Sequence, residues 1–239
     1  MKCNICSHES AFFSKIQILE KYVVSYFICP SCGYLQTEEP FWLKEAYEQP
    51  INKNDTGMLT RNFNNARITN MVILALFNKK GKFLDYGGGY GIFVRLMRDK
   101  GREFYWYDTY CTNLFAKDFE HRDVRQYDLV TAFEVFEHLP DPLKEFERLF
   151  SLGENLLLTT ECLPFPVPDL DKWWYYGLEH GQHISLFTRQ ALVLIAKKFG
   201  RHYYHSGSFH LFTKNKVSPL FYILSKKPIA AVLDDIIYP

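Results

Sequence analysis

The sequence predicts a mixed α/β protein, in which a domain with a mostly parallel sheet follows a small metal-bound ribbon. Residues 82–99 contain a short apolar strand, a run of glycines and an amphipathic helix, and a second apolar strand follows at 103–107. Four of the six cysteines lie in the first 32 residues, in two Cys-x-x-Cys pairs. A strand–helix–strand order is typical of parallel sheets, because parallel neighbours need a long crossover connection.

Length and composition limit the possible functions. A chain of 239 residues holds one full α/β domain plus a small appendage, and we place a ribbon at 1–40, a helical connection at 41–80 and the sheet domain at 81–239. The 28 basic and 27 acidic residues nearly cancel, which makes nucleic acid an unlikely partner. The first ten residues contain no apolar run, and the longest apolar run, "MVILALF", is too short to span a bilayer. We therefore expect a cytoplasmic protein without a membrane partner.

The N-terminal cysteines predict a zinc ribbon. Two Cys-x-x-Cys loops separated by 22 residues can bring four thiolates to one ion, and zinc prefers such a tetrahedral sulfur set. The intervening segment alternates and is rich in β-branched and aromatic residues, as expected for a hairpin. A closed four-cysteine site is structural, and residues 1–40 contain three Lys, no Arg and four Glu, which disfavours nucleic-acid binding. The predicted zinc ligands are Cys3, Cys6, Cys29 and Cys32.

Residues 41–80 predict a helical connection. "FWLKEAYEQP" is interpreted as a short helix that ends at Pro50, and "NNARITNMVILALFNKKG" as an amphipathic helix that ends at Gly81. The polar segment between them contains Arg61. It fits two descriptions equally well: a solvated linker, or a lid over a ligand whose carboxylate meets Arg61.

The stretch "KFLDYGGGYGIFVRLMRD" predicts a ligand-binding turn. Glycines between a strand and a helix let a ligand approach the backbone and sit at the helix N-terminus. Asp108 ends the second strand, 21 residues after Gly87, where a carboxylate suits paired ribose hydroxyls. Ile92 stands where the nicotinamide fingerprint needs glycine, and Asp85, two residues before the first glycine, suits a cationic ligand.

These two motifs resemble the first two motifs of class I S-adenosylmethionine-dependent methyltransferases. "YDLVTAFEVFEHLPDP" (127–142) resembles the fourth strand and following loop of the branch that includes ubiquinone and sugar methyltransferases, and "ENLLLTT" resembles the fifth strand. A cysteine ribbon also precedes this fold in sugar C-methyltransferases. The resemblance covers residues 81–215 and implies a Rossmann-like sheet of seven mostly parallel strands with an antiparallel C-terminal strand.

The same resemblance implies how the chain would hold S-adenosylmethionine. The acid and glycines of the first motif would hold the methionine part, Asp108 would accept the ribose hydroxyls, and the end of the fourth strand would lie beside the cofactor. The predicted cofactor-binding residues are Asp85, Tyr86, Gly87, Gly89, Gly91, Asp108, Thr109, Phe133 and Glu134, with Arg61 from the lid.

The segment "WWYYGLEHGQHISLF" (173–187) follows a proline-rich loop and precedes a helix that we expect Thr188 to cap. It would lie at the carboxyl ends of the strands, where open α/β sheets bind ligands. "GQHISLFT" resembles "HEHxSYFS" of sugar C-methyltransferases, which implies that His183 takes part in substrate chemistry; a hydrogen-bonded loop residue is the alternative. The expected acceptor wall is Trp173, Trp174, Tyr175 and Tyr176.

The favoured function is methyl transfer to a small molecule, such as a sugar, a nucleotide-sugar or another polyhydroxylated metabolite, with His183 as general base. The alternatives are an RNA base methyltransferase that uses the ribbon for recognition, and a non-catalytic cofactor-binding protein. The non-basic ribbon disfavours the first alternative and the intact cofactor motifs disfavour the second. For Glu137 and His138 we expect a structural role, capping and solvating the loop before the helix near Pro142.

Overall fold

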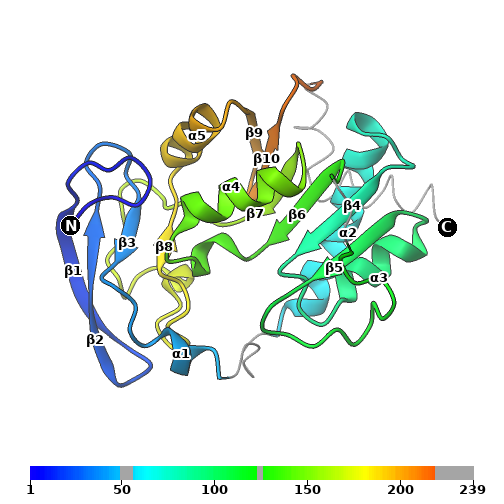
Figure 1. The fold of residues 1–239 in the computed structure, drawn as a ribbon. Helices are drawn as coiled ribbons and strands as arrows, with labels where there is room; N and C mark the ends of the chain where they lie inside the picture. Colours follow the sequence, from blue (N-terminus) through cyan, green and yellow to red (C-terminus); the bar gives the residue numbers. More distant parts are fainter. Residues whose placement is uncertain (49–55, 123–125, 219–239) are drawn as a thin grey trace. The chain divides into compact units, whose positions relative to one another are not determined.

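The structure, a computed structural model, describes residues 1–48, 56–122 and 126–218 (Figure 1). The chain divides into two compact units. The first comprises Met1–Asn52, Glu134–Arg148 and Thr160–Arg201, and the second comprises Lys53–Phe133, Leu149–Thr159 and His202–Pro239. Within the described ranges, no helix is both long and apolar enough to cross a membrane. The predicted helix end at Pro50 lies outside the described residues.

The second unit is built on a six-stranded sheet in the order β5-β4-β6-β7-β10-β9. The first four of these strands run parallel, β10 is antiparallel to β7, and β9 forms a hairpin with β10. This arrangement confirms the expected mostly parallel sheet with an antiparallel C-terminal strand. The bounds are β4 (Lys82–Tyr86), β5 (Glu103–Tyr107), β6 (Leu129–Phe133), β7 (Leu156–Thr159), β9 (His202–Ser206) and β10 (Phe209–Thr213).

Two helices cover this sheet and complete the core of the second unit. They are α2 (Met58–Leu76), which begins earlier than predicted, and α3 (Ile92–Asp99). Val72 and Ile73 of α2 and Val94 of α3 pack with Phe83 and Phe104 of the sheet, all fully buried. The central strand β7 reads "LLLT" and is buried throughout, as expected for a parallel strand with apolar contacts on both faces.

The predicted seventh strand is not formed in the part of the chain that the structure describes. The segment "CTNLFAKDFEHRDVRQ", which follows β5 and stands where the third strand of this fold is expected, contributes one isolated parallel bridge, between Trp106 and Glu120. The segment is short and polar, and Asp118 has a φ of 72°, which interrupts an extended backbone. The sheet therefore ends with a turn-rich segment where a full strand was expected.

The first unit contains a four-stranded antiparallel sheet in the order β1-β2-β3-β8. Its strands are β1 (Ala11–Ile18), β2 (Tyr22–Ile28), β3 (Leu35–Thr37) and β8 (Ser185–Leu186). The last strand comes from far along the chain, and it pairs Leu186 with Leu35 and Ser185 with Gln36. The cysteine ribbon and residues 160–201 therefore share one sheet and one apolar core.

The helices of the first unit include α1 (Leu43–Ala46) and α5 (Arg189–Lys198), and α4 (Pro142–Leu152) begins in it. As predicted, Thr188 caps α5: its hydroxyl oxygen accepts a hydrogen bond from the Ala191 N–H at 3.1 Å. The same hydroxyl donates to the carbonyl of Cys32 at 2.5 Å. The cap therefore also fastens α5 to the second cysteine loop.

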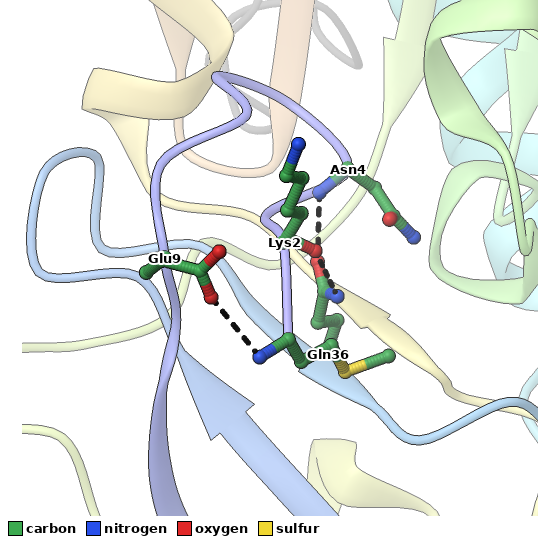
Figure 2. Close-up of polar contacts among 5 residues, drawn as sticks. Lys2, Asn4, Glu9 and Gln36 are labelled. Atoms are coloured by element: carbon green, nitrogen blue, oxygen red, sulfur yellow. Dashed lines mark hydrogen bonds and ion pairs between the residues drawn. The ribbon is translucent and has the colours of Figure 1, made fainter.

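Gln36 ties the N-terminal segment to β3 (Figure 2). Its Oε1 accepts a hydrogen bond from the Asn4 N–H at 2.9 Å, and its Nε2 donates to the Lys2 carbonyl at 3.0 Å. The side chain is buried, so both halves of the amide are satisfied within the protein. These bonds position the first cysteine loop beside β3, the strand that follows the second cysteine loop.

Candidate functional site

The glycine loop lies at the carboxyl end of β4, directly before α3. Gly87, Gly89 and Gly91 have φ values of 72°, 52° and 87°. The N–H groups of Gly87 and Gly88 both donate to the carbonyl of Tyr107, at the end of β5, at 2.9 and 3.1 Å. The loop therefore spans the ends of two parallel strands, at the edge where open α/β sheets bind ligands.

Asp108 stabilises this loop and remains able to accept further hydrogen bonds. Its Oδ2 accepts from the Gly89 N–H at 2.9 Å, and its Oδ1 accepts from the N–H groups of Tyr110 and Cys111 at 2.7 and 2.8 Å. A carboxylate offers about four lone-pair positions. Three are used here, which leaves capacity for a ribose hydroxyl at the predicted position.

Asp85 is buried beneath the loop, with 3% of its surface exposed. Its Oδ1 accepts a hydrogen bond from the Thr131 hydroxyl at 2.7 Å. Burial raises the pKa of the carboxyl group to about 7; the charge of Asp108 adds to this and the Thr131 bond opposes it. A cationic ligand would favour the ionised form, and S-adenosylmethionine carries both a sulfonium and an ammonium group.

We expect the affinity for S-adenosylmethionine to rise from about pH 5.5 to about pH 7.5, by up to about tenfold per pH unit below the pKa. Below pH 7 Asp85 is mostly protonated, and a cation that lowers its pKa must displace that proton. The ligand's own α-amino group stays largely protonated in this range. Asp85→Asn should bind more weakly and with a flat profile. Calorimetry across this range measures both, and an equal slope in the variant would contradict the assignment.

Two neighbouring glycines allow a matched test of the loop. A Cβ on Gly91 would lie 2.7 Å from Asn113 Oδ1 and 3.0 Å from the backbone nitrogen of Ala116, whereas a Cβ on Gly89 meets nothing within 4 Å. We expect Gly91→Ala to destabilise the fold by about 2–4 kcal/mol, because it adds a clash to an unfavourable φ. Gly89→Ala should cost about 1 kcal/mol and mainly weaken cofactor binding.

Denaturant unfolding and calorimetry separate the two effects in the glycine variants. If Gly89→Ala bound S-adenosylmethionine normally, the empty space beside residue 89 would not be part of the cofactor site.

The remaining predicted cofactor residues of the second unit lie at or near the strand ends, except Arg61. Tyr86 is buried and stacks on Tyr107, with ring centroids 5.1 Å apart, and Phe133 is half-buried against other core rings. Thr109 is exposed just after β5, and Arg61 is exposed in the first turns of α2. Their contacts with the cofactor stay predictions, as does a lid role for residues 41–80.

Glu134 follows β6 directly and has a φ of 54°, which is unusual for a residue with a side chain. Such a conformation often marks a functional turn. Its place beside the cofactor stays a prediction.

The two cysteine loops share one backbone pattern. Ser7 and Gly33, which follow the second cysteine of each pair, have φ values of 62° and 71°. Their N–H groups donate to the carbonyls of Cys3 and Cys29 at 3.0 and 2.8 Å. Each loop therefore folds its two thiols to the same side.

The four thiols converge on one point. The Sγ atoms of Cys3 and Cys32 are 3.6 Å apart, those of Cys6 and Cys29 3.4 Å, and those of Cys6 and Cys32 3.6 Å. Four sulfurs around zinc at ~2.3 Å would be separated by about 3.8 Å. The predicted ligand set thus fits a tetrahedral zinc ion with small adjustments.

A second group of ionisable side chains gathers in the first unit, from residues far apart in the sequence. One ligand atom from each of Glu137, His138 and His183 lies within 4.8 Å of the others. Glu137 is fully buried, and its Oε1 accepts a hydrogen bond from the Tyr175 hydroxyl at 2.5 Å. The Nδ1–H of His183 donates to the Tyr175 carbonyl at 2.6 Å, which leaves Nε2 with a lone pair. We refer to Glu137, His138 and His183 as the Glu–His cluster.

Burial strongly shifts the pKa values of the three side chains in the cluster. It raises the pKa of Glu137 to about 8, with a contribution from the nearby charge of Glu134. It lowers the pKa of His183 to about 3 and that of His138 well below its usual range, with the neighbouring histidines adding to the effect. Without a bound cation, both rings are therefore neutral at neutral pH. Perturbed groups of this kind often mark functional sites.

The expectation that Glu137 would cap and solvate its loop was wrong. Its side chain is fully buried, and only its backbone carbonyl serves the loop, accepting from the Ile184 N–H at 2.8 Å. The sequence signal that could have identified it is the Glu137–His138 pair in the motif after the fourth strand. Its pairing with His183 depends on the fold.

The aromatic run Trp173–Tyr176 divides between core and surface. Tyr175 and Tyr176 are 1% exposed and pack in the core of the first unit, and the Tyr176 hydroxyl donates to the Pro168 carbonyl at 2.8 Å. Trp174 is 75% exposed and Trp173 is half-buried. The run is therefore not one continuous exposed wall, and Trp173 and Trp174 are the members that can still meet an acceptor through their faces.

The loop that carries His183 is held by the ribbon and by α1. The Leu19 N–H, at the tip of the β1–β2 hairpin, donates to the Leu178 carbonyl at 2.9 Å. Trp42 Nε1–H donates to the Gly181 carbonyl at 2.8 Å, and Gln182 Nε2–H donates to the Ala46 carbonyl at 2.7 Å. The N-terminal 46 residues therefore shape the loop from both sides.

Comparisons with known proteins agree with this geometry. A family described as "Methyltransferase domain" matches residues 61–205, more than half of the chain. No curated protein matches the sequence significantly. An O-methyltransferase family 2 protein from Planctomyces limnophilus, solved in complex with apigenin, aligns with a TM-score of 0.51 and 14% identity, over 72% of this chain and 66% of that chain.

Two further solved structures align at lower TM-scores. The mitomycin 7-O-methyltransferase aligns with a TM-score of 0.47 and 12% identity over 72% of this chain, which spans 59% of that enzyme's length. The magnesium protoporphyrin IX methyltransferase from Synechocystis, with bound S-adenosylhomocysteine, aligns with a TM-score of 0.46 and 13% identity, over 72% of this chain and 94% of that chain.

Three features belong to the cofactor side of a known fold. They are the strand order of the sheet, the glycine loop above buried Asp85, and the Asp108 carboxylate at the end of β5. The family match includes strands β4 to β7, the glycine loop, Asp85 and Asp108. The chain belongs to the methyltransferase-domain family and is a class I S-adenosylmethionine-dependent methyltransferase.

Proposed function

We propose that this protein transfers the methyl group of S-adenosylmethionine to a small hydroxylated acceptor, namely a sugar, a nucleotide-sugar or another polyhydroxylated metabolite. The proposal includes membership of the branch related to ubiquinone and sugar methyltransferases. The observation that carries the proposal is the Glu–His cluster: three ionisable groups converge in the fold, and two of them, Glu137 and His138, belong to the motif that resembles this branch. A hydroxyl acceptor needs such groups, because its proton must leave as the new bond forms.

His183 is the candidate proton acceptor within the cluster. Its Nδ1–H is committed to the Tyr175 carbonyl, so the tautomer places the lone pair on Nε2. The ring is half-buried, so part of this residue remains exposed. Trp173 and Trp174 offer aromatic faces for the apolar face of a sugar ring.

The proposed reaction is an in-line displacement. The acceptor oxygen forms a bond to the methyl carbon, the carbon–sulfur bond breaks, and the sulfonium becomes the neutral thioether of S-adenosylhomocysteine. The acceptor's O–H bond breaks and its proton passes to the cluster or to solvent. Because the cofactor already carries its leaving group, the protein contributes mainly alignment and proton removal.

The ribbon is proposed to hold structural zinc at its four cysteines. A closed four-thiolate site leaves no open coordination position for an acceptor. Its part in the reaction is indirect, through the hairpin tip and α1 that hold the loop of His183.

A methyl-transfer screen tests the proposed function. The full chain is incubated with isotope-labelled S-adenosylmethionine and with nucleotide-sugars, free sugars, catechols and structured RNA, and products are resolved by mass. We expect label in a hydroxylated small molecule, and none with Asp108→Ala, which lacks the predicted ribose acceptor. Label only in RNA, or in no substrate by a protein that binds the cofactor, would refute the proposal.

A further inference from the structure

The Glu–His cluster has a feature that a proton-transfer role alone does not require. Glu137 and His183 each have one polar atom bonded to the protein and a second without such a bond, and His138 has an unbonded buried ring nitrogen. In Glu137, Oε1 accepts from Tyr175, while Oε2 is buried and has no hydrogen-bond partner among the described residues. An unpartnered buried carboxylate oxygen is costly unless something else satisfies it.

The two histidines also offer a ring nitrogen without a hydrogen bond to the protein. The backbone of Gln182 lies beside the His138 ring, and the Nδ1 of this ring is buried and without a hydrogen-bond partner in the described part of the chain. His183 donates its Nδ1–H to the Tyr175 carbonyl, which leaves the lone pair on Nε2. Histidines that bind metals almost always donate their other ring N–H to a carbonyl or carboxylate, because that bond fixes the tautomer and the ring orientation.

We infer that Glu137, His138 and His183 form a binding site for a divalent transition-metal ion, separate from the zinc of the cysteine ribbon. Two imidazoles and one carboxylate are the ligand set of catalytic zinc sites and of two-histidine, one-carboxylate iron sites. Zinc suits a methyl transfer best, because the reaction moves no electrons to or from a metal.

The distances support this assignment. The three ligand atoms lie within 4.8 Å of one another, and ligand atoms around a tetrahedral ion at ~2.1 Å are separated by about 3.4 Å. Bringing atoms from 4.8 Å to that spacing shortens a separation by about 1.4 Å, which side-chain rotations can supply. Glu137 closes the buried side, whereas both histidines are half-buried, so a fourth position can face an incoming molecule.

The role of the ion in the reaction rests on the proposed function, whereas its binding does not. An ion at Nε2 removes the need for a strong base, because it lowers the pKa of an oxygen bound to it. The acceptor's O–H bond would break on the ion, its proton would pass to solvent, and the oxygen would then attack the methyl carbon. The acceptor class is thereby narrowed to molecules whose hydroxyl binds the ion. An acceptor with a second oxygen next to that hydroxyl would bind best, because both oxygens could contact the ion.

Cobalt(II) titration of the full chain, freed of metal and kept reduced, tests the inference. We expect two equivalents to bind. One gives the thiolate charge-transfer absorption of the ribbon, and the other adds only d–d bands of nitrogen and oxygen ligands. Glu137→Gln preserves the side-chain shape and should weaken only the second equivalent, by about 100-fold or more, since loss of supporting groups alone costs 10–100-fold. His183→Ala should do the same.

His180→Ala is the matched control, because His180 neighbours His183 without belonging to the cluster, and it should still bind two equivalents. One equivalent in the wild-type chain, with only the thiolate spectrum, would overturn the inference without the use of any variant. An unchanged second equivalent in Glu137→Gln would also overturn it. Because these readouts need no acceptor, they succeed or fail independently of the methyl-transfer screen.

Discussion

Replacing His183 by alanine is expected to lower turnover on the identified acceptor by about 10²–10⁴-fold, the usual range for the loss of a general base. The same change would remove a ligand of the inferred metal ion, so the direction holds for both roles. The affinity for S-adenosylmethionine should stay within error, because the contacts of the glycine loop and Asp108 do not involve this ring. Steady-state kinetics and calorimetry on the same preparation measure both quantities.

His180→Ala is expected to lower turnover much less. The Nδ1 of His180 accepts a hydrogen bond from the Gln182 N–H at 3.1 Å, so this ring stabilises the turn without belonging to the cluster. Near-normal turnover of His183→Ala would make His183 a hydrogen-bonded loop residue, which is the alternative that its sequence context also allows.

Removing one zinc ligand is expected to have the largest effect on stability. Cys32→Ser should lose the zinc and unfold the first unit well beyond the ribbon, because apparent binding free energies of structural zinc are about 10–16 kcal/mol. The damage should spread because β3 pairs with β8, and because Val24 and Tyr26 share a core with Tyr175 and Ile184. Elemental analysis measures the loss of zinc, and hydrogen exchange of residues 177–186 measures the unfolding beyond the ribbon.

Cofactor affinity is the discriminating measurement in the zinc-ligand variant. The glycine loop and Asp108 belong to the second unit, so Cys32→Ser should still bind S-adenosylmethionine while losing turnover. Cys162→Ser is the matched control, since this half-buried cysteine lies in the same unit outside the four-thiol set. A zinc-free wild-type protein with full stability would rule out a structural metal.

The sequence by itself determined the features that depend on local chemistry. Glycines at 87, 89 and 91 are required by left-handed backbone between a strand and a helix, and they were visible as a motif. The cysteine spacing identified a four-thiol set, because each loop brings its own pair together. Thr188 was recognised as a cap from its place before an apolar helical pattern, and it makes the expected bond.

Only the tertiary structure decided which polar and aromatic residues are buried. Glu137, which is fully buried, and His138, which is half-buried, lie in a short loop that looks solvent-exposed from its own residues, and the segment with His183 that covers them comes much later in the chain. The run of four aromatics gave no alternating pattern, yet the turn at Trp174–Tyr176 sends two rings into the core and leaves Trp174 outside. The pairing of β8 with β3 is likewise long-range. Burial of this kind depends on the summed packing of distant segments, and no local pattern encodes it.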